Sequence, residues 1–131
     1  MVFVFCEKYQ NLGDNEKALK YHKKAISIYK KVLDKNHPFL AISYNNIATT
    51  YLYLGDNEKA LEYNEKALKI KEKVLDKNHP DLATSYNNIA STYKNLGDNE
   101  KALEYHKKAI SIREKVLDKN HPFLAISYTS L

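Results

Sequence analysis

The heptapeptide Gly-Asp-Asn-Glu-Lys-Ala-Leu begins at residues 13, 55 and 97, and it sets the organisation of the whole chain. The three prolines, Pro38, Pro80 and Pro122, keep the same spacing of 42 residues. Aligned on this period, residues 13–54 and 55–96 are identical at 30 of 42 positions. A fixed period in this range indicates stacked repeats, because each unit buries its apolar face only against its neighbours.

Each repeat is predicted to contain two helices. After each Gly-Asp pair, a stretch of about twenty residues has no Gly or Pro, and in the third copy its apolar positions recur with a period near 3.6. Asp98 is of a residue type that favours the N-cap. The helix should end before Pro122, since the residue preceding a proline avoids the α region, and Pro122 can begin the next helix.

The shorter second helix carries two different faces. In the middle copy it is predicted over about residues 81–96, where Tyr86, Ile89, Ala90 and Tyr93 form one apolar stripe. A second stripe is free of charge and consists of Thr84, Asn87, Asn88, Ser91 and Asn95, matched in the preceding copy by Ile42, Asn45, Asn46, Thr49 and Tyr53. Solvated helix faces usually carry Lys and Glu, so a repeated uncharged face indicates a contact surface.

This pattern resembles the tetratricopeptide repeat, in the 42-residue form of kinesin light chains and related scaffold proteins. The segment 79–90 is very similar to the corresponding part of light-chain repeats, and the segment from Lys115 to Pro122 looks like the extension that lengthens a 34-residue repeat. The resemblance covers residues 7–128. Its other matching residues are Ala90, Tyr93, Gly97, Asp98, Ala102 and Ala109.

The resemblance implies an all-α fold, an α-solenoid or right-handed superhelix of antiparallel helix pairs, with about three repeats and truncated ends. The chain, 1–131, would form a single repeat domain with units at about 1–38, 39–80 and 81–122 and a partial helix at 123–131. It also implies a concave groove, lined by the shorter helices, that holds an extended or helical peptide.

Under this resemblance, the ligand-contacting positions of the family fall on the uncharged face, at Asn45, Asn46, Thr49, Tyr53, Asn87, Asn88, Ser91 and Asn95. Asn46 and Asn88 are expected to hydrogen-bond the backbone of a bound peptide, because an amide offers both donors and an acceptor. Tyr53, which Asn11 and Asn95 replace in the sister copies, is the expected specificity residue. The near-neutral face argues against a preference for acidic ligands.

The formal net charge of +5 does not indicate nucleic-acid binding, because its surplus is concentrated in residues 13–37 and Lys is mixed with Asp and Glu elsewhere. Arg113 is the only arginine, so base-edge readout is not expected. No run of 18 apolar residues suits a membrane span. The lone Cys6 suits a reducing compartment, and a cytoplasmic location is the default expectation.

No cofactor, metal site or catalytic site is expected. His37, His79 and His121 are equivalent positions on successive repeats, and helices about 8–10 Å apart cannot bring such residues to one metal ion. Cys6 aligns with Ala48 and is predicted to pack as a small apolar residue. A site that recurs three times is typical of scaffolding, so the chain is expected not to be an enzyme.

Two functional interpretations stay open. The first is a non-catalytic protein–protein interaction scaffold that binds a peptide or protein segment in a concave, asparagine-lined groove. The alternative is a homo-oligomer in which near-identical repeats stack end to end through uncapped terminal helices. The apolar segments that favour stacking are residues 2–5 and 123–126.

Overall fold

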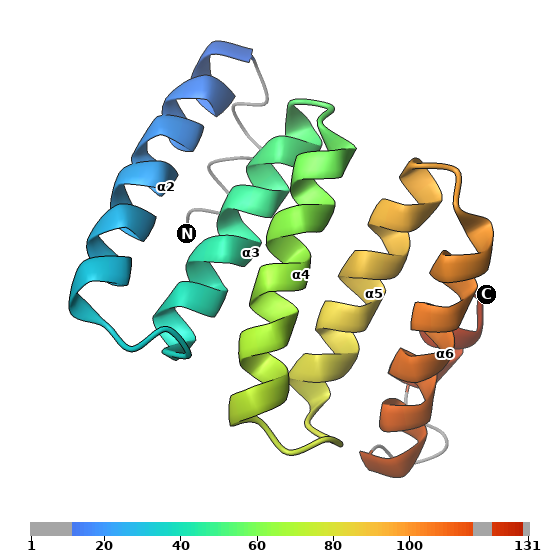
Figure 1. Ribbon diagram of the computed structural model, residues 1–131. Helices are drawn as coiled ribbons and strands as arrows, with labels where there is room; N and C mark the ends of the chain where they lie inside the picture. The colour runs from blue at the N-terminus through green and yellow to red at the C-terminus, as the bar shows by residue number, and fades with distance from the viewer. Residues whose placement is uncertain (1–11, 117–121, 130–131) are drawn as a thin grey trace.

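The computed structural model describes residues 12–116 and 122–129 (Figure 1). Within these ranges the chain forms α-helices and no strands. The helices are α2 (Leu12–Val32), α3 (Pro38–Tyr53), α4 (Asn57–Val74), α5 (Pro80–Asn95), α6 (Asn99–Val116) and α7 (Pro122–Thr129). The predicted apolar segment 2–5, together with Cys6 and His121, lies outside the described residues.

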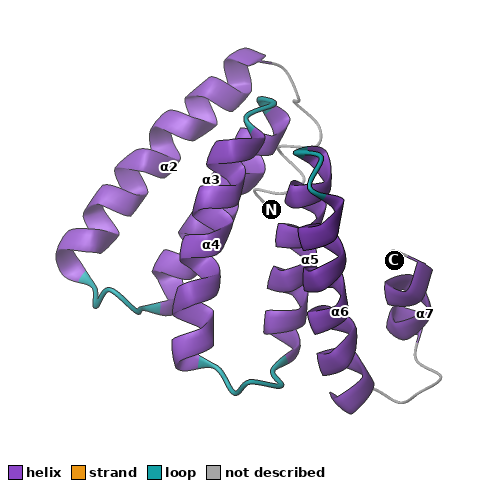
Figure 2. Ribbon diagram, turned by 45° about the vertical axis from the view of Figure 1, so that its right-hand side comes forward, coloured by secondary structure: helices purple, strands orange, loops and turns teal. Residues whose placement is uncertain are grey.

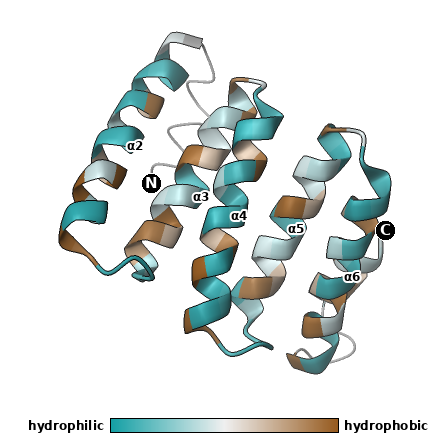
Figure 3. Ribbon diagram, viewed as in Figure 1, coloured by the Kyte–Doolittle hydropathy of each residue, from teal (hydrophilic) through white to brown (hydrophobic). Residues whose placement is uncertain are grey.

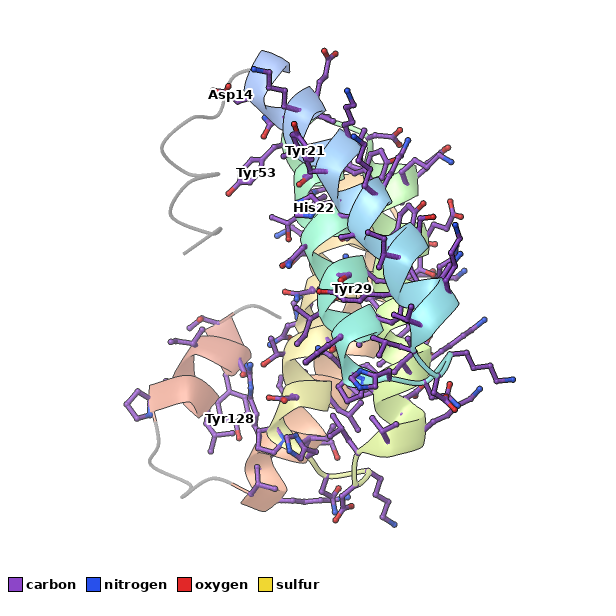
Figure 4. The ribbon with its side chains drawn as sticks, turned by 90° about the vertical axis from the view of Figure 1, so that its left-hand side faces the viewer. Asp14, Tyr21, His22, Tyr29, Tyr53 and Tyr128 are labelled. Atoms are coloured by element: carbon purple, nitrogen blue, oxygen red, sulfur yellow. The ribbon has the colours of Figure 1, made fainter. Side chains whose placement is uncertain are left out.

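Each helix packs against the next one in the chain, and the helices form two layers (Figures 1 and 4). One layer holds α2, α4 and α6, along which hydrophilic residues predominate (Figure 3), and the other holds α3, α5 and α7. Packing is most extensive within the pairs α3–α4 and α5–α6. Helix α7 packs on α6 at the C-terminal end of the stack (Figure 2). The predicted α-solenoid of antiparallel helix pairs is confirmed.

The helices α3 and α5 each begin at a His-Pro pair. His37 and His79 are the N-caps, and the Nδ1 atom of each accepts a hydrogen bond of 3.1 Å from the backbone N–H two residues further on. Pro38 and Pro80 follow at the start of the helix, where the fixed φ of proline suits the first turn and its missing N–H has no partner to lose. The sequence predicted the role of proline but not the histidine cap.

A glycine in the left-handed region ends both α3 and α5. Gly55 has a φ of +79° and Gly97 has a φ of +86°, a conformation that an L-residue adopts only at a cost. Asp56 and Asp98 follow as N-caps of α4 and α6, and each side chain accepts a 3.1 Å hydrogen bond from the backbone N–H three residues on. The predicted capping role of Asp98 is therefore confirmed.

The first copy of the heptapeptide behaves differently. Gly13 and Asp14 lie inside α2, whereas their equivalents Gly55 and Asp56 lie in the turn before α4. The prediction that every Gly-Asp pair precedes its helix is wrong for this copy. Gly55 reverses the chain after α3 with a left-handed φ, whereas Gly13 lies inside α2, where no left-handed φ is needed.

The core lies between the two layers and recurs from repeat to repeat. Ile47 and Ile89 are both fully buried. Tyr63 stands between Tyr44 and Tyr51, with ring centroids 5.9 and 5.7 Å apart, and Tyr105 repeats the arrangement between Tyr86 and Tyr93 at 6.0 and 5.7 Å. These contacts confirm the predicted packing face. Tyr128, the equivalent of the buried Tyr44, is 49% exposed, because no described helix packs on that side of α7.

Candidate functional site

Helix α3 is buried on every side but one. Its buried residues are Leu40, Ala41, Ser43, Tyr44, Ile47, Ala48, Thr50 and Tyr51. Five of the residues that stay exposed or half-buried follow the i, i+3, i+7, i+10, i+14 spacing of a single line along a helix. We call this line the α3 stripe, and it consists of Phe39, Ile42, Asn46, Thr49 and Tyr53.

The equivalent line on α5 is open along its whole length. This α5 stripe consists of Asp81, Thr84, Asn88, Ser91 and Asn95, all of which are exposed. The helices α3 and α5 belong to the same layer (Figure 4), and their stripes occupy equivalent positions of successive repeats. Figure 4 shows Tyr53 projecting on the side of the molecule on which α7 lies.

The two stripes differ in chemistry. Large apolar or aromatic side chains occupy both ends of the α3 stripe, where Phe39 is 53%, Ile42 is 54% and Tyr53 is 36% exposed. The α5 stripe is polar throughout and carries one charged residue, Asp81, near its start. Only the amide level, Asn46 and Asn88, and the hydroxyl level next to it are chemically alike in both stripes.

Six of the eight predicted ligand-contacting residues lie on these stripes: Asn46, Thr49, Tyr53, Asn88, Ser91 and Asn95. Asn45 and Asn87 lie beside the stripes and are half-buried. The Thr49 hydroxyl donates to the Asn45 carbonyl oxygen at 3.0 Å, which leaves its lone pairs to accept. The Asn95 Nδ2 lies 3.5 Å from the Asn57 Oδ1.

The amide of Asn87 has partners inside the protein. A guanidinium can only donate, so the amide is oriented with its Oδ1 accepting from Arg113 at 2.7 Å and its Nδ2 donating to the Nδ1 of His106 at 3.1 Å. Arg113 also donates to the Ser127 hydroxyl at 2.7 Å. These bonds connect α5 to α6 and, through Arg113, to α7, so a ligand would compete with them for Asn87.

His106 is a neutral acceptor in this network. Burial, and to a lesser degree the positive charge of Lys94, lower the pKa of His106 below its ordinary value. A neutral imidazole accepts at Nδ1 when its proton is on Nε2, which fits the amide orientation at Asn87. The equivalent residue in the middle copy is Asn64, which is also buried and lies 3.5 Å from the Thr92 hydroxyl.

Four residues of the stripes were absent from the predicted ligand-contacting set, and two of them, Phe39 and Asp81, were absent from the predicted uncharged face as well. Both fall three positions before Ile42 and Thr84, so extending the helical spacing by one step would have found them. Asp81 stands near Lys71, whose Nζ donates to the Ser85 hydroxyl at 3.2 Å. Burial lowers the pKa of Lys71, and the nearby Asp81 carboxylate partly offsets that effect.

Other kinds of site have little support in the described part of the chain. Residues 12–116 and 122–129 contain no group of three or more His, Cys, Asp and Glu placed to hold a metal ion. None of the described helices is long and apolar enough to cross a membrane.

The fold and the site define a helical-repeat protein with an open face on one of its two layers. The tetratricopeptide repeat family matches this chain at residues 8–73, 56–115 and 81–131. The chain therefore belongs to the tetratricopeptide repeat family, and its neighbours among solved structures are of the kinesin-light-chain-like kind.

Three solved structures illustrate the similarity. A kinesin-light-chain-like protein of Podosopora anserina with nearly identical repeats has a TM-score of 0.78 and 26% identity, over 96% of this chain and 63% of that one. BtubC of P. vanneervenii has a TM-score of 0.83 and 22% identity, over 97% and 51% of the two chains. The N-terminal domain of stress-induced protein-1 of C. elegans has a TM-score of 0.60 and 20% identity, over 88% and 80%.

The present chain thus spans less than two thirds of the P. anserina and P. vanneervenii chains. The two structures below 25% identity support the fold alone. No similarity to a curated protein sequence was found.

Proposed function

We propose that this chain is a non-catalytic scaffold whose α3 and α5 stripes bind a peptide or protein segment. Tetratricopeptide repeats generally mediate protein–protein interactions. The observation that carries the proposal is the pair of aligned, solvent-accessible stripes on one layer of the stack, with Asn46 and Asn88 at the same level of both. In this proposal the stripes take the place of the asparagine-lined groove expected from the sequence.

The amides supply the sequence-independent part of the binding. A peptide backbone presents one N–H donor and one C=O acceptor per residue, and each asparagine can satisfy both. Apolar side chains of the ligand would pack against Phe39, Ile42 and Tyr53, which are already partly exposed to water in the free protein. Removing that surface from water is the non-directional part of the affinity.

The proposal is tested with peptides selected from a random displayed library on the immobilised protein. We expect replacement of both Asn46 and Asn88 by Ala to weaken the selected peptides by about fivefold to 150-fold, since two interfacial hydrogen-bond sets are lost, each of about 0.5–1.5 kcal/mol. The matched control replaces Lys69 and Ser111 by Ala, an equivalent exposed pair on the α4–α6 layer. Unfolding of the asparagine double variant, or unchanged affinity, would contradict the proposal.

A second candidate function, end-to-end self-association, is supported by the exposure of α2. Ile28 is 60% exposed, whereas the equivalent Ile70 and Ile112 are 5% and 6% exposed. Tyr21 is 63% exposed, although the equivalent Tyr63 is enclosed by Tyr44 and Tyr51. This face of α2 is thus equivalent to the face on which α4 packs against α3 and α6 packs against α5.

Helix α7 offers the complementary surface. Residues 122–128 have the same sequence as residues 38–44, and Tyr128 is exposed where Tyr44 is buried. In a stack of two chains, α7 of one copy would pack on α2 of the other as α3 packs on α4, with Tyr128 against Tyr21. Lys24 already lies over the Tyr21 ring at 5.4 Å, as Lys66 does over Tyr63 at 4.9 Å.

Light scattering over a hundredfold range of concentration tests the association. The mass should rise with concentration for the wild type and for Tyr53→Glu, which alters only the α3 stripe. Tyr21→Glu should keep the mass at that of a monomer. A wild-type mass that stays constant across the range excludes end-to-end association and leaves peptide binding untouched.

A further inference from the structure

The differences between α3 and α5 are concentrated on their stripes. Comparison of residues 38–53 with 80–95 shows five differing positions among sixteen. Four of the five belong to the stripes, namely Phe39/Asp81, Ile42/Thr84, Thr49/Ser91 and Tyr53/Asn95, and the fifth is Leu52/Lys94. All eight buried positions of α3 have the same residue in α5. The copies therefore keep one core and present different chemistry on the open face.

The N-terminal ends of the three shorter helices form a row of alternating character. Ile42 on α3 is 54% exposed and Ile126 on α7 is 58% exposed, and both are apolar. Between them α5 presents Thr84 and Asp81, both exposed and polar. Across the layer, this row is therefore apolar on α3, acidic and polar on α5, and apolar on α7.

Packing within the protein does not account for the apolar members of this row. The Phe39 ring lies 6.1 Å from Tyr29 and 4.7 Å from His37, and more than half of the side chain is nevertheless open to solvent. Ile42 and Ile126 are more exposed still. Exposed apolar groups in a shared position on one face are typical of a surface that receives a partner.

The acidic member is open to a ligand as well. The Asp81 side chain is 66% exposed, and its Oδ2 lies 3.9 Å from the Nδ1 of His79, which is already accepting a hydrogen bond from the backbone of Asp81. An acidic residue in the first turn favours a helix, but α3 begins at the same His-Pro cap with Phe39 in its place. Asp81 is also the only charged residue on the two stripes.

We propose, building on the peptide-binding function above, that the stripes select an extended peptide with a basic residue between two apolar residues. The apolar side chains pack against Phe39 with Ile42 and against Ile126, and the basic side chain pairs with Asp81. Because α3, α5 and α7 follow one another in the same layer (Figure 4), the anchors come in the order apolar, basic, apolar along the ligand.

A displayed library of random peptides, selected on the full chain and sequenced, tests this pattern. On the wild type we expect enrichment of the apolar-basic-apolar pattern. Asp81→Lys should replace the central Lys or Arg by Asp or Glu, and Asp81→Asn should remove the preference for a charge without a size change. The matched control is Glu100→Lys, the same charge reversal in the first turn of α6 on the other layer, which should leave the wild-type pattern intact.

The affinity of one enriched peptide gives a second readout. An exposed ion pair contributes about 0.2–1 kcal/mol, so Asp81→Asn should weaken that peptide by up to about fivefold at low salt, with a smaller difference at high salt. Enriched peptides without a central basic residue, or with the same residue for the wild type and Asp81→Lys, would overturn the ligand pattern. If these peptides still depend on Asn46 and Asn88, the scaffold function survives, and if they do not, both proposals fail.

Discussion

The repeat supplies a matched pair of isoleucines with opposite environments. Ile28 on α2 and Ile70 on α4 occupy the same position of successive repeats, yet Ile28 is 60% exposed and Ile70 is 5% exposed. We predict that Ile70→Ala destabilises the protein strongly and that Ile28→Ala has little effect. The difference arises from packing alone, because the two substitutions are chemically identical.

The magnitude follows from the burial of the two side chains. Ile→Ala removes three carbon groups, each worth about 0.8 kcal/mol when buried, which gives about 2.4 kcal/mol for Ile70 before any cavity is counted. Incomplete collapse of the cavity raises the expected loss to about 3 kcal/mol. For Ile28 less than half of the side chain is removed from water, and the higher helix propensity of Ala offsets part of that loss. The expected change there is below about 0.5 kcal/mol.

Urea unfolding followed by circular dichroism measures both changes. A loss of about 3 kcal/mol is a large share of the 5–15 kcal/mol typical of a domain, so the urea midpoint for Ile70→Ala should shift clearly at an unchanged m-value. Ile112→Ala, at a 6% exposed position, should behave like Ile70→Ala. Equal destabilisation by Ile28→Ala and Ile70→Ala would show that the α2 face is covered in solution, and the reasoning from exposure would be refuted.

Three further predictions use the same unfolding assay. Gly55→Ala should cost about 1 kcal/mol because its φ is +79°, although a Cβ there meets no atom within 4 Å. Gly13→Ala inside α2 should instead stabilise the protein by about 0.5–1 kcal/mol. A gain in stability for Gly55→Ala would contradict the argument from φ. Asn87→Ala should cost about 1–3 kcal/mol, because the Nδ1 of His106 loses its donor and Arg113 loses its bond to the Asn87 amide and keeps the one to the Ser127 hydroxyl, whereas the exposed Asn88→Ala should be neutral. Burial lowers the pKa of His106 below 6.5, so the unfolded chain binds more protons than the folded one as the pH falls through 6.5, and stability is lost towards pH 5. The variant His106→Asn, which introduces the residue found at position 64, should reduce that loss. An unchanged dependence of stability on pH would exclude His106 as its source.

The fold was predictable because the same sequence pattern recurs in three copies. The 42-residue period, the His-Pro breaks and the 3.6-residue periodicity all agree with one arrangement of helices, and such agreement across levels specifies a structure. The prediction failed where the context of a repeated motif changes. Gly13 and Gly55 are followed by the same six residues, but Gly13 lies inside α2 whereas Gly55 lies in the turn after α3.

The sequence predicted an uncharged face on the shorter helices but not the partners of each residue on it. Adjacent residues on a helix point about 100° apart, so Asn87 and Asn88 could not be told apart without knowing where α6 lies. The structure places Asn87 within hydrogen-bonding distance of His106 and leaves Asn88 exposed. Likewise, a His-Pro pair indicates a turn in sequence, whereas the hydrogen bond that the Nδ1 of His37 accepts from the backbone N–H of Phe39 depends on a side-chain conformation.

The sequence differences between equivalent helices fall at different kinds of position in the two layers. Between α4 and α6 the differences include buried positions, such as Leu68/Ile110 and Asn64/His106, where each residue fits its own local packing. Between α3 and α5 the buried positions are all unchanged, and four of the five differences lie on the open stripes. Since an exposed change affects stability by only about 0.5 kcal/mol, the stripes can vary without disturbing the core. A repeat array built in this way can recognise different side chains along one ligand with nearly identical units, which is the reason to seek its selectivity at Phe39, Tyr53 and Asp81.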